Sequence, residues 1–455
     1  MDVTKDKHNI NMLNGPLVKS IIKFALPIAL SSILQQLFNS ADTAIAGKFG
    51  TADALAAVGT NGEIVALAVS LSAGLAVGAN VVISHFIGAG QKEKISNAVR
   101  TSMVYSLIAG ILLGAIGAVS AEPLLRLINT PDDILNSAVL YLRLYSIGIP
   151  FLMVYDFGSA ILRSKGDSKR PLVALIVSGF INILLNLFFV IILEMSVAGV
   201  ALATDISTLL SAIIIMYWLS REDGELRFSF KDVKINKESL IKINAIGIPA
   251  ALQGAVFCVA NIFIQSAINT FGSEAAAGSA IAMNFEYIAY YVNTSFGQAA
   301  STFTAQNFAA GNVKRCKKIF IACLVLGLIF AVLMCGTFVL FRHQLSALFS
   351  SSADEIKYSC ERIMIILLFQ PLCTLYEIPA WTMRGLGYST MPALETMLGI
   401  CLIRIVWIYT VFRHFNTLNS LFSAFPFTWI ITSLIINITF ILVWRKTNKS
   451  VQTTY

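Results

Sequence analysis

The stretch IIKFALPIALSSILQQLFNSADTAIAG, residues 21–47, is apolar for most of its length and yet contains the carboxylate Asp42. A helix that crosses the hydrocarbon core of a bilayer needs about 20 mostly apolar residues. This stretch is long enough, and it lacks the strict alternation of a barrel strand. It therefore predicts a membrane-spanning helix with a charged side chain inside it.

The composition of the whole chain extends this prediction. The 455 residues are 56% hydrophobic and only 13% charged, whereas soluble proteins average about 25% charged residues. An open sheet cannot cross a bilayer because its edges would stay unpaired. We therefore predict an all-α membrane protein with twelve transmembrane helices. The expected spans are 18–47, 54–84, 98–121, 135–161, 171–194, 197–219, 240–270, 276–308, 315–341, 357–383, 390–412 and 420–444.

The basic residues indicate the orientation of these spans. Lys and Arg concentrate at the N-terminus, in every second loop and at the C-terminus, which predicts that both termini are cytoplasmic. The alternate loops contain few basic residues, namely Lys48, Arg126, Arg342, Lys357 and Arg413. This distribution also accounts for the formal charge of +8 without a nucleic-acid partner. The seven cysteines all lie in the second half, mostly in apolar runs, and are expected to be small packing residues.

The second half of the chain repeats the first at an offset of about 222 residues. Pro27 is equivalent to Pro249, and after a one-residue gap RSKGDSKRP, 163–171, is equivalent to RGLGYSTMP, 384–392. The repeat predicts two pseudo-symmetric six-helix lobes, 1–219 and 240–455, joined by a cytoplasmic linker, 220–239. Parallel repeats of this kind occur in transporters, although a gene duplication in a structural or channel protein would give the same pattern.

Several stretches together resemble one transporter family. They are PIALSSILQQLFNSADTAIAG (27–47), ALAAVGTNGEI (54–64), GLAVGANVVISHFIGAGQ (74–91), RSKGDSKRP (163–171), FINILLN (180–186), VAGVALAT (197–204) and MRGLGYSTMP (383–392). The chain resembles multidrug and toxic compound extrusion (MATE) transporters, and among these the DinF-like branch. The resemblance implies two six-helix lobes and export of bulky, often cationic or amphipathic organic molecules. It also implies that inward flow of protons or sodium ions drives the export.

A cation-coupling site is predicted around Asp42. A charge inside a span costs about 2.5–3.5 kcal/mol on insertion scales, so a partner, a cation or a proton must offset it. Asn182 and Asn186 lie one turn apart late in an outward-running span, and Thr204 lies early in the next span, so all four residues fall at a similar depth. Their oxygens suit a sodium ion or a protonatable acid. The alternative is that the Asn and Thr side chains only bond helix to helix.

The resemblance is incomplete at this site. DinF-like members with a described cation site usually carry Asp at the position of Asn186, so its loss leaves the coupling ion open between sodium and proton. Asp205, next to Thr204, could supply the missing charge, although successive helical residues point about 100° apart.

The second half offers candidate substrate contacts. Glu286 either attracts a cationic substrate or forms a buried ion pair with Arg404, and we favour the ion pair. Met283, Tyr287 and Tyr290 lie near Glu286 at helical spacing and could contact flat substrates, although such a stripe more often serves packing. Gln253 is a further candidate substrate contact. Some relatives of another bacterial branch carry an acid at this position, so the resemblance implies that the second-half cation site of that branch is absent here.

Two further predictions concern residues that hold or bend the helices. The repeat-equivalent acids Asp156 and Glu377 are expected to be partners of Arg163, Arg384 or helix ends. Pro27 is a candidate hinge, because a proline removes a backbone hydrogen bond and can kink its helix.

The function predicted is secondary active efflux of amphipathic or cationic compounds by alternating access, in the plasma membrane. We expect a multi-pass monomer with the lipid bilayer and small organic substrates as partners, and no cofactor beyond the coupling ion. The alternative is a lipid-linked precursor flippase or polysaccharide exporter of the same wider superfamily. A channel remains a different class, and the scattered histidines His8, His85, His343 and His414 argue against an enzyme.

Overall fold

The protein is built from long helices. The computed structural model describes residues 10–50, 52–229 and 234–452, and this part of the chain contains no strand, so the predicted all-α fold is confirmed. The helices of the first half are α1 (Leu17–Phe49), α2 (Ala52–Thr60), α3 (Gly62–Gly88), α4 (Lys92–Leu127), α5 (Asp132–Ser164), α6 (Lys169–Leu187), the π-helical turn η1 (Phe188–Ile192) and α7 (Ser196–Ser220). After the short turn η2 (Gly224–Leu226), the second half contains α8 (Lys237–Asn269), α9 (Ser273–Ala309), α10 (Val313–Leu340), α11 (Arg342–Ala347), α12 (Ala353–Phe369), η4 (Gln370–Leu372), α13 (Cys373–Gly385), α14 (Thr390–Thr396), η5 (Met397–Leu402), α15 (Ile403–Trp407), η6 (Ile408–Phe412), α16 (Arg413–Phe415) and α17 (Leu418–Gln452).

Most of these helices are long and apolar enough to cross a membrane. Within the described residues, 11 helical segments meet that condition. The 37-residue helix α9 is long enough but is not among them, because polar side chains such as Asn284, Glu286 and Asn293 interrupt its apolar sequence. The count of twelve spans and the cytoplasmic location of the termini therefore stay predictions.

The predicted single span 54–84 is wrong in detail, because the chain breaks at Asn61 into α2 and α3. The buried Asn61 amide donates to the carbonyls of Ala57 (2.8 Å) and Ala138 (3.0 Å). An Asn with glycines on either side, Gly59 and Gly62, favours a turn over a continuous helix.

Contacts divide the chain into two compact units. The first contains Leu30–Ala251 and the second contains Asn11–Ala29 and everything from Leu252 onward. Helices α1 and α8 therefore each contribute to both units, and they change unit at Leu30 and Leu252, which are equivalent in the repeat. This division differs from the predicted lobes 1–219 and 240–455 at these two helices, since each is long enough to have two packing neighbourhoods.

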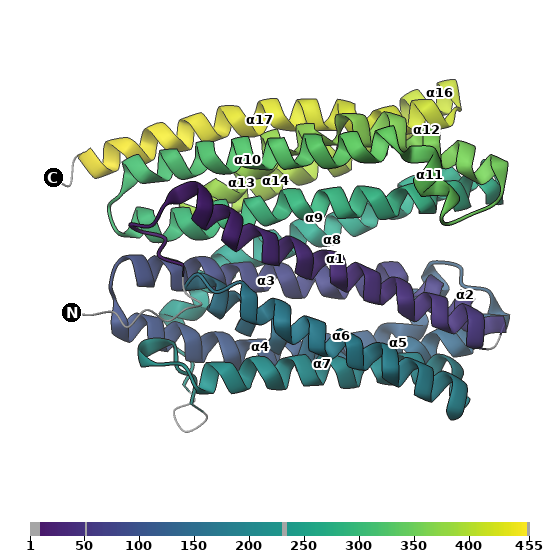
Figure 1. Cartoon of the computed structure of the whole chain (residues 1–455), viewed down its shortest axis with the longest axis horizontal. Coiled ribbons are helices and arrows are strands. Elements are labelled where there is room, and N and C mark those ends of the chain that lie inside the picture. Colours follow the sequence, from purple (N-terminus) through teal and green to yellow (C-terminus); the bar gives the residue numbers. More distant parts are fainter. Residues whose placement is uncertain (1–9, 51, 230–233, 453–455) are drawn as a thin grey trace. The chain divides into compact units, whose positions relative to one another are not determined.

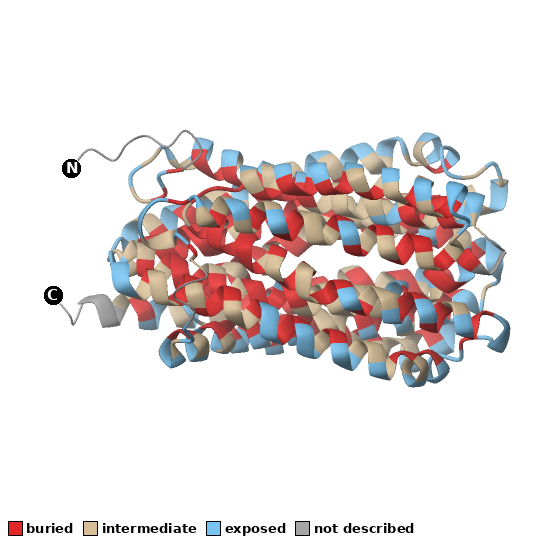
Figure 2. Ribbon diagram, turned by 90° about the horizontal axis from the view of Figure 1, so that it is seen from below, coloured by how far each residue is buried: buried red, intermediate tan, exposed pale blue. Residues whose placement is uncertain are grey.

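The first unit is organised around α5. Helices α3, α4 and α7 pack along α5, and α6 packs on α7 (Figure 1). Close approach depends on small residues: a Cβ added at Gly110 of α4 would lie 2.6 Å from the Pro150 Cα, and one at Gly114 would lie 2.5 Å from the Ser146 carbonyl oxygen. In both units the buried residues lie on inner helix faces and exposed residues on outer faces (Figure 2).

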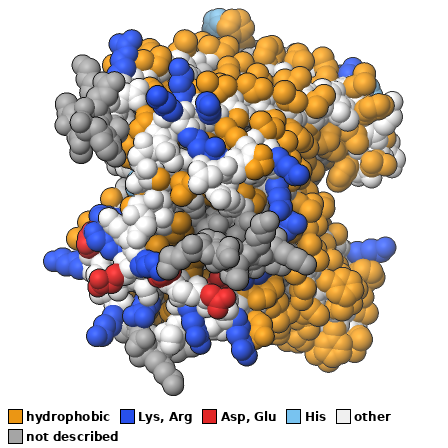
Figure 3. Space-filling model, turned by 60° about the vertical axis from the view of Figure 1, so that its left-hand side comes forward, with side chains coloured by type: hydrophobic (Ala, Val, Ile, Leu, Met, Phe, Trp, Pro, Cys, Tyr) orange, Lys and Arg blue, Asp and Glu red, His pale blue; other side chains and the backbone are white. Residues whose placement is uncertain are grey.

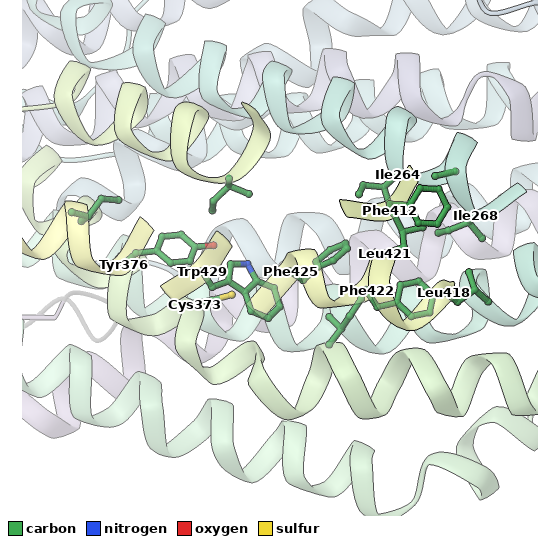
Figure 4. Packing of buried hydrophobic residues seen from close by; sticks show 14 of the residues in the cluster. Ile264, Ile268, Cys373, Tyr376, Phe412, Leu418, Leu421, Phe422, Phe425 and Trp429 are labelled. Carbon is green, nitrogen blue, oxygen red and sulfur yellow. The ribbon is translucent and has the colours of Figure 1, made fainter. Parts of the chain in front are cut away.

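In the second unit α9 packs against α10, α12 and α13, and α17 packs against α12 and α13. A cluster of aromatic and aliphatic side chains lies inside this unit, with Trp429 of α17 beside Tyr376 and Cys373 of α13, and Phe425 and Phe422 farther from them (Figure 4). Figure 3 shows Lys and Arg side chains gathered at the helix ends nearest the termini, with hydrophobic side chains over the flanks. This distribution is typical of a protein whose flanks face lipid.

Candidate functional site

The four residues predicted to form the cation site do come together in the first unit. Asp42 lies in the second half of α1, Asn182 and Asn186 lie on α6, and Thr204 lies on α7. The Asn186 Nδ2 donates to Asp42 Oδ1 (2.5 Å), and the Thr204 hydroxyl lies 3.1 Å from Asp42 Oδ2. Asn186 Nδ2 also lies 3.3 Å from Asn182 Oδ1, as expected for residues one turn apart.

Asp42 is a buried carboxylate without a cationic partner. Only 6% of the residue is exposed, and it forms no ion pair with any Lys or Arg that the structure describes. The groups that interact with its oxygens are the neutral side chains of Thr204, Asn186 and Asn182. The negative charge is thus offset only by neutral hydrogen-bond donors, which leaves it able to bind a proton or a cation.

Two details of hydrogen bonding leave oxygen atoms open for a ligand. Thr204 Oγ1 lies 3.0 Å from the Val200 carbonyl as well as 3.1 Å from Asp42, and its single proton can serve one of them at a time. When that proton points to Val200, the Thr204 oxygen can accept a bond from a protonated Asp42 or bind a cation. Asn186 Oδ1 is buried and has no hydrogen-bond partner in the described part of the chain.

The donor set is that of a single-acid site. Within the described ranges no group of three or more His, Cys, Asp or Glu residues could hold a metal ion. The oxygens around Asp42 are instead one carboxylate, two amides and one hydroxyl. Hard neutral oxygens with one negative charge suit a monovalent cation or a proton.

Asp205 does not join the four residues. Although it neighbours Thr204, it is buried on another side of α7, and a Cβ added at Gly148 of α5 would lie 2.1 Å from Asp205 Oδ1. It shares no hydrogen bond with Asp42, Asn186 or Thr204.

The predicted ion pair between Glu286 and Arg404 is wrong. Glu286 of α9 pairs with Arg362 of α12, whose Nε and Nη2 donate to the two carboxylate oxygens at 2.6 and 2.9 Å. Arg362 also donates to Ser279 Oγ (2.7 Å). Arg404 instead lies over the Phe425 ring, 4.0 Å from its centroid.

Sequence reasoning missed Arg362. A signal was present, because α9 and α12 begin at the same predicted face of the membrane and both Glu286 and Arg362 lie within their first four turns. The depth of each residue in the membrane would have made both Arg362 and Arg404 possible partners of Glu286. The rotation of each helix about its own axis decides which arginine faces Glu286.

Two other predicted substrate contacts belong to a polar chain inside the second unit. Tyr290 donates to Glu377 Oε1 (3.3 Å), and the Trp381 indole donates to Glu377 Oε2 (2.9 Å). Arg384 donates to Gln253 Oε1 and stacks on Trp381, 4.7 Å from the ring centroid. Gln253 and Tyr290 are thus engaged with buried protein groups.

The repeat-equivalent acids have different direct partners. Ser72 Oγ donates to Asp156 Oδ2 at 2.6 Å, and Arg163 interacts with Asp156 electrostatically. Glu377 likewise interacts electrostatically with Arg384 but bonds to Tyr290 and Trp381. The expected association of each acid with its arginine is therefore found as a charge interaction, with hydrogen bonds to other side chains.

The remaining candidates lie as follows. Met283 and Tyr287 of α9 are half-buried, and the Tyr287 ring stacks on Tyr291 with centroids 6.2 Å apart. Pro27 lies inside α1, three residues before Leu30, where the helix changes unit. A pocket of about 660 Å³ in the second unit is lined by other residues, among them Arg342, Lys357 and Met364. None of the predicted substrate residues lines it.

Comparisons with known proteins agree with this architecture. The MatE family model matches residues 27–188 and again 249–410, which confirms the internal repeat. A probable multidrug resistance protein of Bacillus subtilis, YoeA, is 28% identical over 442 residues, covering 94% of both chains. The probable multidrug resistance protein NorM of Thermotoga maritima is 27% identical over 403 residues, covering 88% of this chain and 86% of the relative.

A solved structure has the same fold. It is an outward-facing conformation of a multidrug resistance MATE family transporter, with a TM-score of 0.89 and 23% identity over 96% of this chain and 98% of the other.

Proposed function

We propose a specific transport cycle for this chain, which belongs to the MatE family. Members of this family are multi-pass plasma-membrane transporters rather than enzymes, and the similarity to multidrug resistance proteins supports drug efflux as the function. The protein exports amphipathic or cationic organic compounds by alternating access. Inward movement of a proton or a sodium ion through the site of Asp42, Asn182, Asn186 and Thr204 drives the export.

One observation carries the proposal: Asp42 is a buried carboxylate inside a span that has neutral oxygen and amide groups around it and no described basic partner. A fixed structural charge in this environment would be costly. A charge that binds and releases a positive ion during the cycle has a reason to be there.

The site offers a place to both candidate ions. A proton on Asp42 would be accepted by Thr204 Oγ1 while the hydroxyl donates to Val200. A sodium ion would be held by Asp42, Thr204 and the amide oxygens of Asn182 and Asn186, one of which, Asn186 Oδ1, has no partner in the described structure. A membrane potential of about 100 mV contributes about 2.3 kcal/mol per cation carried inward, which supports a substrate gradient of about fiftyfold.

Pro27 is the proposed hinge of the cycle. It precedes the point at which α1 passes from the second unit to the first, and Asp42 lies farther along the same helix. Binding of the ion at Asp42 would favour one bend of α1 at Pro27 over another.

The substrate contacts are proposed more narrowly than the sequence suggested. Met283 and Tyr287 remain candidates, since both are half-buried on α9. Glu286, Tyr290 and Gln253 already bond to Arg362, Glu377 and Arg384, so they would meet a substrate only after exchanging these partners.

The test is dye efflux from proteoliposomes under separately imposed proton and sodium gradients. Asp42→Asn should abolish gradient-driven efflux, and the gradient that drives the wild type identifies the ion. Asp132→Asn is the matched control, because Asp132 is an exposed carboxylate at the start of α5. If Asp42→Asn exports as well as the wild type under either gradient, the site is assigned wrongly.

A further inference from the structure

The pocket of about 660 Å³ in the second unit is formed by residues of α11, the first half of α12 and the start of α17. Ligand pockets typically have volumes of about 300–1,000 Å³. Helix α11 and the start of α12 lie at the opposite end of the second unit from the end of α17 (Figure 1). The loop that contains α11 is one of the alternate loops that the charge distribution predicts to lie outside the cell. The pocket is therefore expected at the outer boundary between lipid and water.

Basic side chains converge on this pocket. Arg342, His343 and Lys357 line it together, although the alternate loops contain few basic residues. Arg342 donates to the carbonyl of Val339 (2.9 Å), and Lys357 Nζ lies 5.9 Å from the ring centroid of Tyr358. Neither cation forms an ion pair with an acid that the structure describes. Both are thus available to an anion.

The balance of charge in the lining indicates the charge of the ligand. Arg342 and Lys357 contribute two positive charges and Glu361 contributes one negative charge, so the lining has a net charge of +1 with histidine counted as neutral. A ligand with a single negative charge matches this balance better than one whose phosphate is compensated by its own ammonium group. Glu361 and Asn419 can also bond to hydroxyl groups. The lining therefore suits a phosphate diester that carries hydroxyl groups.

The rest of the lining is mostly apolar, and it continues along one face of α12. Lys357 and Glu361 lie one turn apart on this helix, and both line the pocket. Met364 and Leu368 continue the same helix face three and seven residues beyond Glu361. They are 37% and 52% exposed. This face changes from charged to apolar with distance from the start of α12, as a phospholipid does from its headgroup to its acyl chains.

A single lysine or arginine near a helix end can extend to the water layer without any ligand. Here the two cations come from different helices, Arg342 from α11 and Lys357 from α12, and they border one pocket. They share that pocket with apolar side chains of α12, among them Ile356 and Met364. This convergence favours an occupant that has both a phosphate and an acyl chain.

We propose that the pocket binds one anionic phospholipid of the outer leaflet, with a hydroxyl-bearing headgroup such as that of phosphatidylglycerol. Arg342 and Lys357 bind the phosphate, and Glu361 and Asn419 bind the headgroup hydroxyls. An acyl chain continues along the apolar face of α12 that begins at Met364. The pocket shares no residue with the Asp42 site, so this proposal stands or falls independently of the proposed function.

The test is native mass spectrometry of the purified full-length protein in detergent with added phosphatidylglycerol. Phosphatidylcholine with the same acyl chains and soluble glycerol 3-phosphate are added in parallel. We expect phosphatidylglycerol to bind more tightly than either. A cation near the membrane surface contributes about fivefold in affinity, so Arg342→Gln/Lys357→Gln should bind phosphatidylglycerol about 25-fold more weakly. Equal binding of phosphatidylcholine, or tighter binding of glycerol 3-phosphate, would overturn the proposal.

The matched control is Lys48→Gln/Arg413→Gln. It removes the same charge from two exposed cations of the alternate loops, and neither of them lines the pocket. This variant should bind phosphatidylglycerol as the wild type does. If both double variants lose affinity equally, the lipid is attracted by surface charge in general and the proposal is wrong.

A third variant fills the pocket without changing any charge. Ala353 is an exposed lining residue at the start of α12, so Ala353→Trp should retain the unfolding temperature of the wild type in lipid-free detergent. It should bind phosphatidylglycerol more weakly, because the indole occupies the space of the headgroup. If Arg342→Gln/Lys357→Gln does not fold, Ala353→Trp decides alone, and wild-type affinity in this variant overturns the proposal.

Discussion

Replacing Arg362 with methionine should destabilise the protein strongly, because it leaves Glu286 in the interior of the second unit without its partner. The Arg362 and Glu286 side chains are 3% and 12% exposed. Arg362 donates two bonds to Glu286 and one to Ser279, at 2.6, 2.9 and 2.7 Å. Its guanidinium also lies 5.3 Å from the ring centroid of Phe422.

The magnitude follows from the cost of an uncompensated buried charge. Removing one partner of a buried ion pair costs about 3–5 kcal/mol, which is roughly two to four orders of magnitude in the ratio of folded to unfolded protein. Replacing both partners by neutral residues of similar volume is often neutral or stabilising. The double variant Glu286→Gln/Arg362→Met should therefore be more stable than Arg362→Met alone.

The assay is thermal unfolding in detergent of the wild type, the two single variants and the double variant, which together form a double-mutant cycle. The same proteins are tested for efflux of a cationic and a neutral dye. Additive losses of stability in the cycle would refute the view that Glu286 and Arg362 act as a pair. Normal stability of Glu286→Gln with selective loss of cationic dye efflux would show instead that Glu286 serves the substrate.

Three further outcomes can be checked on the purified protein. Gly74→Ala should lower the unfolding temperature, since the added Cβ would lie 2.3 Å from the Ala251 Cα and overpacking costs about 1–3 kcal/mol; an unchanged temperature would contradict the close contact of α3 and α8. Arg315→Met removes the bonds from its guanidinium to the carbonyls of Met12 (3.3 Å) and Gly15 (2.6 Å), so limited proteolysis should cleave the N-terminal segment faster than in wild type. All seven cysteines are buried, so a maleimide should label them only after denaturation.

The sequence was sufficient for the all-α fold and for the residues around Asp42. Apolar run length predicts a helix directly, and a span with known direction gives each residue a depth. Depth was enough to bring Asp42, Asn182, Asn186 and Thr204 together, because polar side chains at one level of a helix bundle can satisfy one another and lipid cannot satisfy them.

The predicted depth of a residue in the membrane could not identify its partner where two candidate partners lie at the same depth. Arg362 and Arg404 both lie inside spans of the second half, and the choice of Glu286 between them depends on how each helix is rotated in the packed unit. The same limit applies to Asp205, whose orientation toward Gly148 could not follow from its position beside Thr204. The break at Asn61 was missed because the residue lies in an apolar run, although its flanking glycines were a local signal.

The internal repeat gives the two halves similar helices, but the polar residues of the Asp42 site have no polar equivalents in the second half. Offsets of about 222 residues before the gap and 221 after it relate the four cation-site positions to second-half residues. The equivalents of Asp42, Asn182, Asn186 and Thr204 are Ile264, Ile403, Trp407 and Phe425.

These equivalent positions are apolar, and they contribute to the core of the second unit. Ile264 and Phe425 belong to its buried cluster (Figure 4). Trp407 packs against that cluster. A cation has no oxygen ligand among these side chains, and the guanidinium of Arg404 lies over Phe425. Ion binding at this level is therefore expected in the first unit alone.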